Sequence, residues 1–171
     1  MASVHPLMTF VSGTSPSLAG VPFAIEGDAA AVQIAVKIAG DLGAAPFAIQ
    51  KQNKSAYHAW GAFSSPLLLA ALATAEQVAR IAGLSIADAR KKMVPIVRQT
   101  IENYSMLGAA EALSGPLVRG DIEIIRRHLD ALKKLPEARE VYLALARSAV
   151  RYLSVKKKKD LQAILKIKKS T

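Results

Sequence analysis

The 171-residue sequence contains no cysteine, which excludes disulfide bonds and thiolate metal sites and leaves the redox compartment undetermined. Aromatic residues are scarce, at 5% of the chain, and there is a single tryptophan. No Gly-x-Gly-x-x-Gly motif occurs, so these residues lack the standard phosphate cradle of a dinucleotide-binding domain. The three histidines, His5, His58 and His128, lack metal-ligand spacing, and we therefore expect no metal.

Hydrophobic residues make up 51% of the chain, which implies much buried helix or a sizeable subunit interface. Residues 59–75 carry no charge for 17 positions, close to the roughly 20 that cross a bilayer. Because this stretch also contains Gly61, Ser65 and Pro66, we interpret it as a buried central helix rather than a membrane span. The first residues lack the basic and apolar regions of a secretory signal, so a cytoplasmic protein is expected.

The formal net charge of +10 is concentrated near the C-terminus, where residues 156–169 contain seven lysines and one aspartate. Such a segment can contact nucleic acid or acidic lipid, but it holds no interleaved aromatic residues and no binding motif. We therefore interpret it as a solvated terminus and do not expect nucleic acid as a partner.

Residues 1–51 show a strand, helix, strand pattern. Short apolar runs predict strands at 2–5, 21–25 and 45–49. Asp28 is a suitable N-cap for a helix over 29–42, and Gly43 is placed to end it. A βαβ unit requires a parallel sheet, and so few strands are not stable alone, so this region resembles the last third of an α/β domain.

The chain from residue 52 onward is predicted to be helical. We expect the fold class to be mainly α, with a βαβ remnant over 1–51 and an all-helical domain with a basic tail over 52–171. Helices are expected at residues 53–80, 85–111 with a bend at Pro95, 122–134, 136–153 and 156–168.

One helical face carries the strongest functional signal. Lys54, Tyr57, His58, Gly61 and Ser65 recur at helical spacing from residue 54. Histidine changes charge near neutral pH, lysine can hold a carboxylate or an oxyanion, and tyrosine can hydrogen-bond a substrate. The alternative is a solvated helix start with a half-buried tyrosine and histidine.

Other candidates stand apart in the sequence. His5 follows a strand end, where α/β domains gather ligands, although a loop histidine is the simpler explanation. Asn103 is a poor choice within a helix, which suggests a buried hydrogen bond or a ligand contact. Arg119 follows a turn and can face an anion, whereas Asp121 is better explained as a helix cap than as a catalyst.

The sequence resembles a family of NADP-binding oxidoreductase-like proteins through several motifs that occur in the same order along the chain. Those proteins join a Rossmann-like domain to a helical domain of unknown function. That helical domain is related to the C-terminal domains of 6-phosphogluconate dehydrogenase and pyrroline-5-carboxylate reductase. The matching pieces are His5-Pro6-Leu7 with Phe10, Phe23-Ala24-Ile25-Glu26-Gly27-Asp28, Lys54-x-x-Tyr57-His58-Ala59, and Leu113-x-Gly115-Pro116-x-x-Arg119-Gly120-Asp121 with His128.

The resemblance implies a substrate-cleft and dimerisation domain of an NADP-dependent oxidoreductase for a small carbonyl or imine compound, assembled as a homodimer. It implies catalytic roles for Lys54, His58 and Tyr57, and substrate contacts for His5, Ser65, Asn103, Arg119 and Asp121. It also implies that the glycine-rich loop lies upstream of Met1, so that this chain alone does not bind NADP. The alternative is a non-catalytic helical dimerisation or interaction module without a cofactor.

Overall fold

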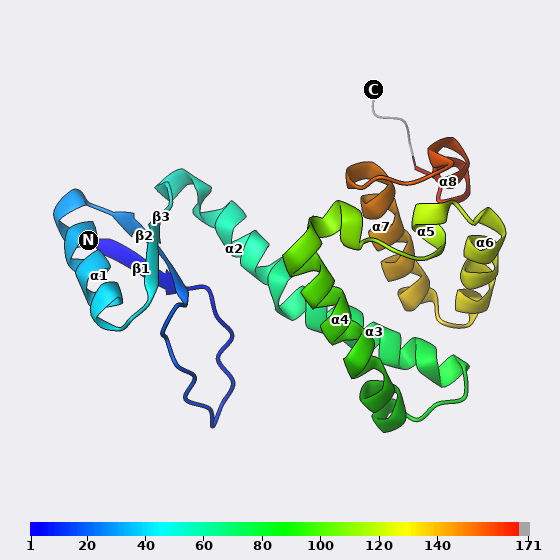
Figure 1. The fold of residues 1–171 in the computed structure, drawn as a ribbon, viewed down its shortest axis with the longest axis horizontal. Coiled ribbons are helices and arrows are strands. Elements are labelled where there is room, and N and C mark those ends of the chain that lie inside the picture. Colours follow the sequence, from blue (N-terminus) through cyan, green and yellow to red (C-terminus); the bar gives the residue numbers. More distant parts are fainter. Residues whose placement is uncertain (168–171) are drawn as a thin grey trace. The chain divides into compact units, whose positions relative to one another are not determined.

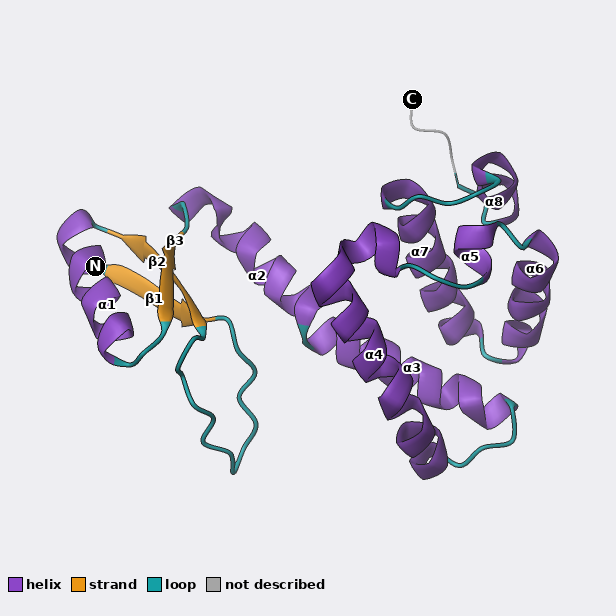
Figure 2. Ribbon diagram, viewed as in Figure 1, coloured by secondary structure: helices purple, strands orange, loops and turns teal. Residues whose placement is uncertain are grey.

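The computed structural model describes residues 1–167. These residues form two compact units, of which the first comprises Met1–Leu69 and the second begins at Ala70. The fold is mainly helical, with a three-stranded sheet near the N-terminus (Figure 1 and Figure 2). This confirms the predicted fold class. The first unit contains both the sheet and the helix that begins at Lys54. The domain boundary expected after residue 51 stays a prediction.

The sheet contains the predicted βαβ unit. Strand β2 (Pro22–Gly27) leads into helix α1 (Ala29–Asp41) and then into β3 (Ala45–Ala48), which pairs with β2 in parallel. Strand β1 (Ala2–Pro6) pairs with the other side of β2 and runs antiparallel to it, which gives the order β1-β2-β3. The antiparallel pairing brings the C-terminal end of β1 opposite the start of β2.

The core of the first unit lies between this sheet and α1. Phe23 and Ile25 on β2 pack against Ala35 and Ala39 on α1, and all four are buried. Gly43 ends α1 as predicted: its φ of 72° is in the left-handed region, and the following amide of Ala44 donates to the carbonyl of Ala39 at 2.9 Å.

The single helix predicted over 53–80 is wrong, because the chain forms two. A short 3₁₀ turn, Lys51–Asn53, leads into α2 (Lys54–Ser64), and α3 (Pro66–Ile81) follows. Ser65 separates them with φ −133° and ψ −80°. The ring of Pro66 disfavours helical geometry at the residue before it, which explains the break.

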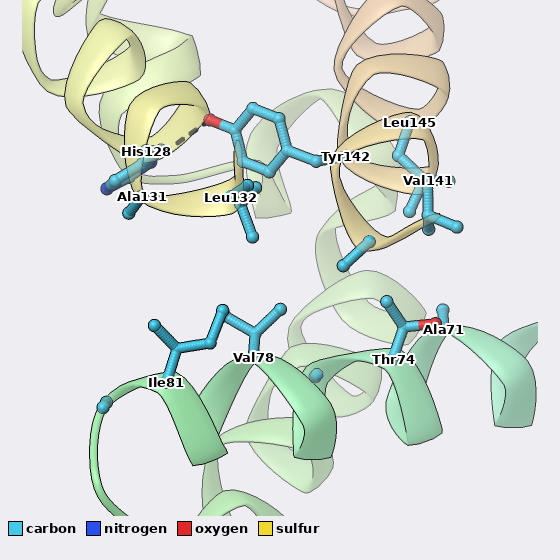
Figure 3. A pocket seen from close by; sticks show the side chains of 13 residues that line it. Ala71, Thr74, Val78, Ile81, His128, Ala131, Leu132, Val141, Tyr142 and Leu145 are labelled. Atoms are coloured by element: carbon cyan, nitrogen blue, oxygen red, sulfur yellow. Dashed lines mark hydrogen bonds between the residues drawn. The ribbon is translucent and has the colours of Figure 1, made fainter. Parts of the chain in front are cut away.

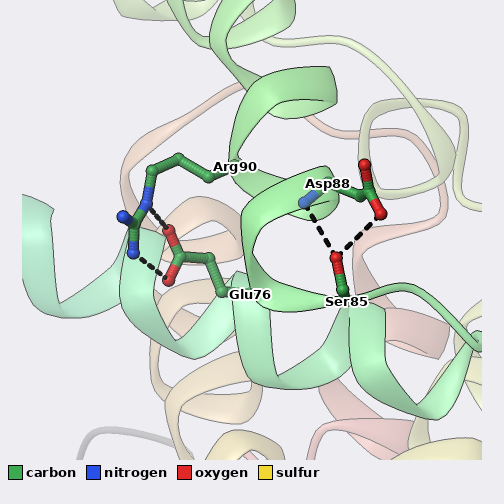
Figure 4. A network of polar contacts seen from close by, with 4 residues as sticks. All are labelled: Glu76, Ser85, Asp88 and Arg90. Carbon is green, nitrogen blue, oxygen red and sulfur yellow. Dashed lines mark hydrogen bonds and ion pairs between the residues drawn. The ribbon is translucent and has the colours of Figure 1, made fainter.

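Helix α4 (Ile86–Ala112) begins with an N-terminal capping box. Ser85 accepts a hydrogen bond from the amide of Asp88 at 3.1 Å, and its hydroxyl donates to the Asp88 carboxylate at 2.8 Å (Figure 4). A two-point ion pair ties α4 to α3: Arg90 donates to both carboxylate oxygens of Glu76, at 2.6 and 3.0 Å (Figure 4). These hydrogen bonds lower the pKa of Glu76 and raise that of Arg90.

Helix α4 contains Pro95, and the bend predicted there stays a prediction. The helix is interrupted at Gly108, where φ is 76° and ψ is 169°. Only glycine adopts this conformation readily, so the break occurs where the sequence permits it.

The remaining helices form a small bundle with its own core. The elements are α5 (Pro116–Arg119), α6 (Ile122–Ala131), a 3₁₀ turn at Leu132–Lys134, α7 (Pro136–Tyr152) and α8 (Lys158–Ile164). Side chains from α6, α7 and α8 meet in its centre, where the buried residues are Ile125, Leu129, Ala146, Val150, Leu161 and Leu165. Residues 168–169 of the predicted basic segment lie outside the described residues.

The expectation that the central helix is buried is also wrong for this chain. The segment Lys51–Ile81 is long and apolar enough to cross a membrane, yet only 6% of its most apolar 18-residue stretch is buried. Trp60 and Phe63, within this segment, are 53% and 71% exposed. Helix α4 is similarly uncovered, since Ala89 is its only buried residue. The core of this chain therefore lies elsewhere, in the sheet–α1 layer and the α6–α8 bundle.

Candidate functional site

A cavity of about 720 Å³ lies in the first unit, between the segment that follows β1 and helix α2. Residues 5–9 line one wall through His5, Leu7, Met8 and Thr9. The other wall comes from α2 and the first turn of α3, through the side chains of Tyr57, His58, Ala62, Ser64, Ser65, Pro66 and Leu69 and the backbone at Gly61. The C-terminal end of β1 and one helical face thus bring together residues that are more than fifty positions apart in the sequence.

His5 and Tyr57 form the polar centre of this cavity. His5 Nδ1 lies 2.9 Å from the Tyr57 hydroxyl, and the two rings meet edge to face with centroids 5.4 Å apart. The hydroxyl also lies 3.4 Å from the carbonyl oxygen of His5. Tyr57 is buried, and burial raises the pKa of its phenol. The phenol is therefore protonated at neutral pH and is available as a hydrogen-bond donor.

His58 completes an aromatic cluster with these two residues. Its ring centroid lies 5.1 Å from that of His5 and 5.6 Å from that of Tyr57. His58 is exposed, whereas Tyr57 beside it is buried. The cluster thus combines a protonated phenol with two imidazoles, and an imidazole can accept or donate a proton near neutral pH.

Lys54 lies on the same helix but is held by other partners. Its Nζ donates to Ser3 Oγ at 2.8 Å and to Glu26 Oε1 at 2.9 Å, and the side chain of Glu26 is only 10% exposed. Because Ser3 belongs to β1 and Glu26 to β2, these hydrogen bonds hold the start of α2 against the sheet. Lys54 is not among the residues that line the cavity, and its catalytic role stays a prediction.

The other predicted substrate contacts divide between the units. His5 and Ser65 line the cavity, whereas Asn103, Arg119 and Asp121 belong to the second unit and do not. Asn103 accepts a hydrogen bond from Gln99 at 2.9 Å. Asp121 occupies the N-cap position of α6 as predicted, but its side chain makes no capping hydrogen bond. It pairs instead with Arg119, whose Nε and Nη2 lie 2.8 and 2.7 Å from Asp121 Oδ2.

The turn that contains Arg119 and Asp121 has an evident structural role. Gly120 has a φ of 68°, and a Cβ added there would lie 2.8 Å from the carbonyl oxygen of Lys156. The amide of Lys156 donates to Val118 at 3.0 Å, so this turn fixes the segment that leads into α8.

A second hollow, a groove of about 620 Å³, lies in the second unit and is lined by α3, α6, the 3₁₀ turn after it, and α7. Figure 3 shows its side chains, among them Val78, Leu132 and Val141. Its polar groups include Thr74 and the pair of His128 Nδ1 and Tyr142 hydroxyl, 3.2 Å apart. Burial raises the pKa of Tyr142. Because no lysine, arginine or carboxylate of residues 1–167 lines it, the groove suits an apolar occupant.

Within residues 1–167, no group of three histidine or carboxylate side chains is placed to hold a metal ion.

A family model described as a domain of unknown function, DUF2520, matches residues 21–149, which is more than half of the chain. The chain belongs to the DUF2520 family. Curated proteins provide no match.

Two solved structures share the fold of this DUF2520 chain. One, from Bacteroides fragilis, is named a "putative NADP oxidoreductase"; it is 21% identical with a TM-score of 0.72, and the match covers 86% of this chain and 56% of that one. The other is a protein from Thermotoga maritima, also 21% identical with a TM-score of 0.72, with coverage of 96% and 61%. The chain therefore shares its fold with these two structures and spans less than two thirds of the length of each.

Sequence reasoning missed three parts of the site. Leu7, Met8 and Thr9 line the cavity, but their types carry no chemical signal, and only their position after His5 could have indicated them. The contacts of Lys54 with Ser3 and Glu26 could not be predicted without knowledge of the strand register. Trp60, which lies three residues after Tyr57 on α2, packs against it with ring centroids 6.0 Å apart.

Proposed function

We propose that this chain forms the substrate-facing part of an NADP-linked oxidoreductase that reduces a small carbonyl or imine compound. The observation that carries the proposal is the convergence of His5, Tyr57 and His58 in one cavity. Support comes from the fold, which is shared with a protein named as an NADP oxidoreductase.

The residues of the cavity suit the proton-transfer half of such a reduction. When a carbonyl or imine carbon gains a hydride, its oxygen or nitrogen must gain a proton. The phenol of Tyr57 is protonated at neutral pH and can donate to that atom. His5 is hydrogen-bonded to the phenol at 2.9 Å and can orient it, and His58 can exchange protons with solvent because it is exposed.

The cofactor does not fit this chain alone. The sequence contains no Gly-x-Gly-x-x-Gly loop to cradle the phosphates of NADP. We therefore assign the cofactor to a dinucleotide-binding region other than these residues. Because Lys54 is held by Ser3 and Glu26 and does not line the cavity, we assign it to positioning α2 on the sheet rather than to proton transfer.

Trp60 provides a direct test of ligand binding in the cavity. It is the single tryptophan of the chain and lies beside Tyr57, so its fluorescence should respond to a ligand there. We expect a saturable change on titration with pyruvate, a small carbonyl compound that bears a carboxylate. His58→Gln should weaken the response about tenfold or more, as expected for the loss of a hydrogen bond to a charged group. His128→Gln, which changes the histidine of the second unit, should not alter it. A linear response that is equal in both variants would contradict the proposal.

A second candidate function, self-association, is favoured by the uncovered apolar surface of α4. Val94, Val97, Ile101 and Tyr104 follow the alternating three- and four-residue spacing of a coiled-coil seam. Val94, Ile101 and Tyr104 are 37%, 49% and 58% exposed. A seam of this kind is stable in water only when a partner covers it, and a second copy presents the same apolar face. The uncharged groove of Figure 3 adds further surface of this kind.

Sedimentation equilibrium tests this second function. We expect the wild-type chain to be a dimer and Ile101→Glu to shift it toward monomer, because a buried, unpaired carboxylate strongly opposes association. Gln99→Glu is the matched control, since it adds the same charge to the same helix away from the seam. A wild-type chain that is monomeric in water and binds to lipid vesicles would overturn the assignment and favour a membrane surface instead.

A further inference from the structure

A third hollow, of about 500 Å³, lies in the second unit between α7 and the end of α8. Arg147, Ser148, Arg151 and Tyr152 line it from α7, and Lys166 lines it from the residues after α8. Arg147 lies one turn before Arg151 on α7, and Ser148 lies one turn before Tyr152, so each pair is adjacent on the helix surface. Among residues 1–167, the lining thus presents three cations and two hydroxyl groups and no carboxylate.

Arg147 is fixed in place by the backbone. Its Nε donates to the carbonyl oxygen of Leu165 at 2.7 Å, and Leu165 is fully buried in the bundle core. Within residues 1–167, the structure gives its other guanidinium N–H groups no hydrogen-bond partner. A guanidinium held by one edge presents its remaining donors in a fixed plane, which matches two oxygens of a phosphate group.

Lys166 occupies a backbone position that ordinarily favours glycine. Its φ is 53°, in the left-handed region, directly after the C-cap of α8. The turn is closed by the amide of Ile167, which donates to the carbonyl of Gln162 at 2.9 Å. The left-handed backbone conformation of Lys166 is energetically unfavourable for a residue other than glycine. Its side chain adds a third cation to the hollow.

We propose that this hollow, named here the α7–α8 basic site, binds the phosphate group of a small phosphate monoester. Three cations that share a hollow without a carboxylate repel one another, and an anion relieves that repulsion. A monoester at neutral pH carries a charge of about −1.5 to −2 and offers three acceptor oxygens. The hydroxyl groups of Ser148 and Tyr152 can donate to the same oxygens, and the apolar side chains of Ala144 and Ile167 provide surface for the organic part. The site is separate from the His5–Tyr57–His58 cavity, and its test does not depend on the proposed oxidoreductase function.

The test is calorimetric titration of the full chain with phenyl phosphate and, separately, with inorganic phosphate, at constant ionic strength set with sodium chloride. We expect saturable binding at one site per chain, with phenyl phosphate bound more tightly than inorganic phosphate. Arg151→Gln should weaken binding about tenfold, as expected when a charge-assisted hydrogen bond is lost. We choose Arg151 because it is exposed, so the variant leaves the contact between Arg147 and Leu165 intact.

Arg126→Gln is the matched control. It removes the same charge from α6, where Arg126 pairs with Glu123 at 2.7 Å and does not line the hollow. Unchanged affinity in this variant, beside the loss in Arg151→Gln, supports the site. Equal weakening in both variants would show that only net charge matters and would overturn the proposal. Binding of a single-stranded oligonucleotide that phenyl phosphate does not displace would overturn it as well, in favour of a nucleic-acid surface.

Discussion

Replacement of Gly120 by alanine tests the role of the α5–α6 turn. Gly120 has a φ of 68°, and its missing Cβ would lie 2.8 Å from the carbonyl oxygen of Lys156 and 3.0 Å from Lys157 Cβ. The nearest atom belongs to the backbone, so it cannot turn aside as a flexible side chain would. The segment at Lys156 must move, and the hydrogen bond from its amide to Val118, 3.0 Å in the native turn, is then lost or strained.

The expected destabilisation is the sum of two effects. An L-residue in the left-handed conformation costs about 1–2 kcal/mol relative to glycine. Loss of one backbone hydrogen bond adds about 1 kcal/mol. We therefore expect Gly120→Ala to lower the free energy of unfolding of the bundle by about 2–3 kcal/mol.

Urea unfolding followed by circular dichroism at 222 nm measures this change, with Gly83→Ala as control. Gly83 also has a positive φ, 87°, but a Cβ there meets nothing within 4 Å, so this variant bears only the conformational cost. We expect it to lose about 1–2 kcal/mol. Equal losses in the two variants would refute the close approach of Gly120 and Lys156.

Two further predictions concern ion pairs. Hydrogen bonds from Arg90 lower the pKa of Glu76 below its ordinary 4.5, so the pair stabilises the fold above that pH and the effect is lost on acidification. Glu76→Gln should therefore unfold at lower urea concentration than wild type at pH 7, and this difference should shrink as the pH is lowered from 7 toward 3; a difference that stays constant over this range would contradict the prediction. Lys54→Met should destabilise the first unit by about 1 kcal/mol by leaving Glu26 unpaired, whereas Lys51→Met should not. Equal unfolding midpoints for these two variants would count against it.

Local sequence signals predicted most of the elements. The Asp28 and Gly43 positions bracket α1, Ser85 and Asp88 begin α4, and Pro136 opens α7. These signals succeed because backbone geometry at a helix end depends on residues that are adjacent in the chain. Asp28 occupies the predicted N-cap position of α1, but its side chain makes no capping hydrogen bond. The break at Ser65 could have been predicted too, since Pro66 restricts the residue before it.

The contacts between distant residues were less accessible from the sequence. Helical spacing placed Lys54, Tyr57 and His58 on one face, but only the strand register shows that Lys54 reaches Glu26 while Tyr57 reaches His5. Hydrophobicity likewise predicted a buried central helix, although Phe63 is 71% exposed. An apolar helix face indicates that something covers it but not whether the cover comes from the same chain.

Turnover by a complete oxidoreductase tests the central claim most directly. We would join this chain to a dinucleotide-binding domain of the Gly-x-Gly-x-x-Gly type and follow NADPH oxidation with small carbonyl and imine compounds. We expect measurable turnover that falls about 10²–10⁴-fold in Tyr57→Phe, the range attributed to a proton donor, while NADPH affinity is unchanged. A chimera that binds NADPH and turns over equally well with Tyr57→Phe would contradict the assignment of this cavity as the reaction site.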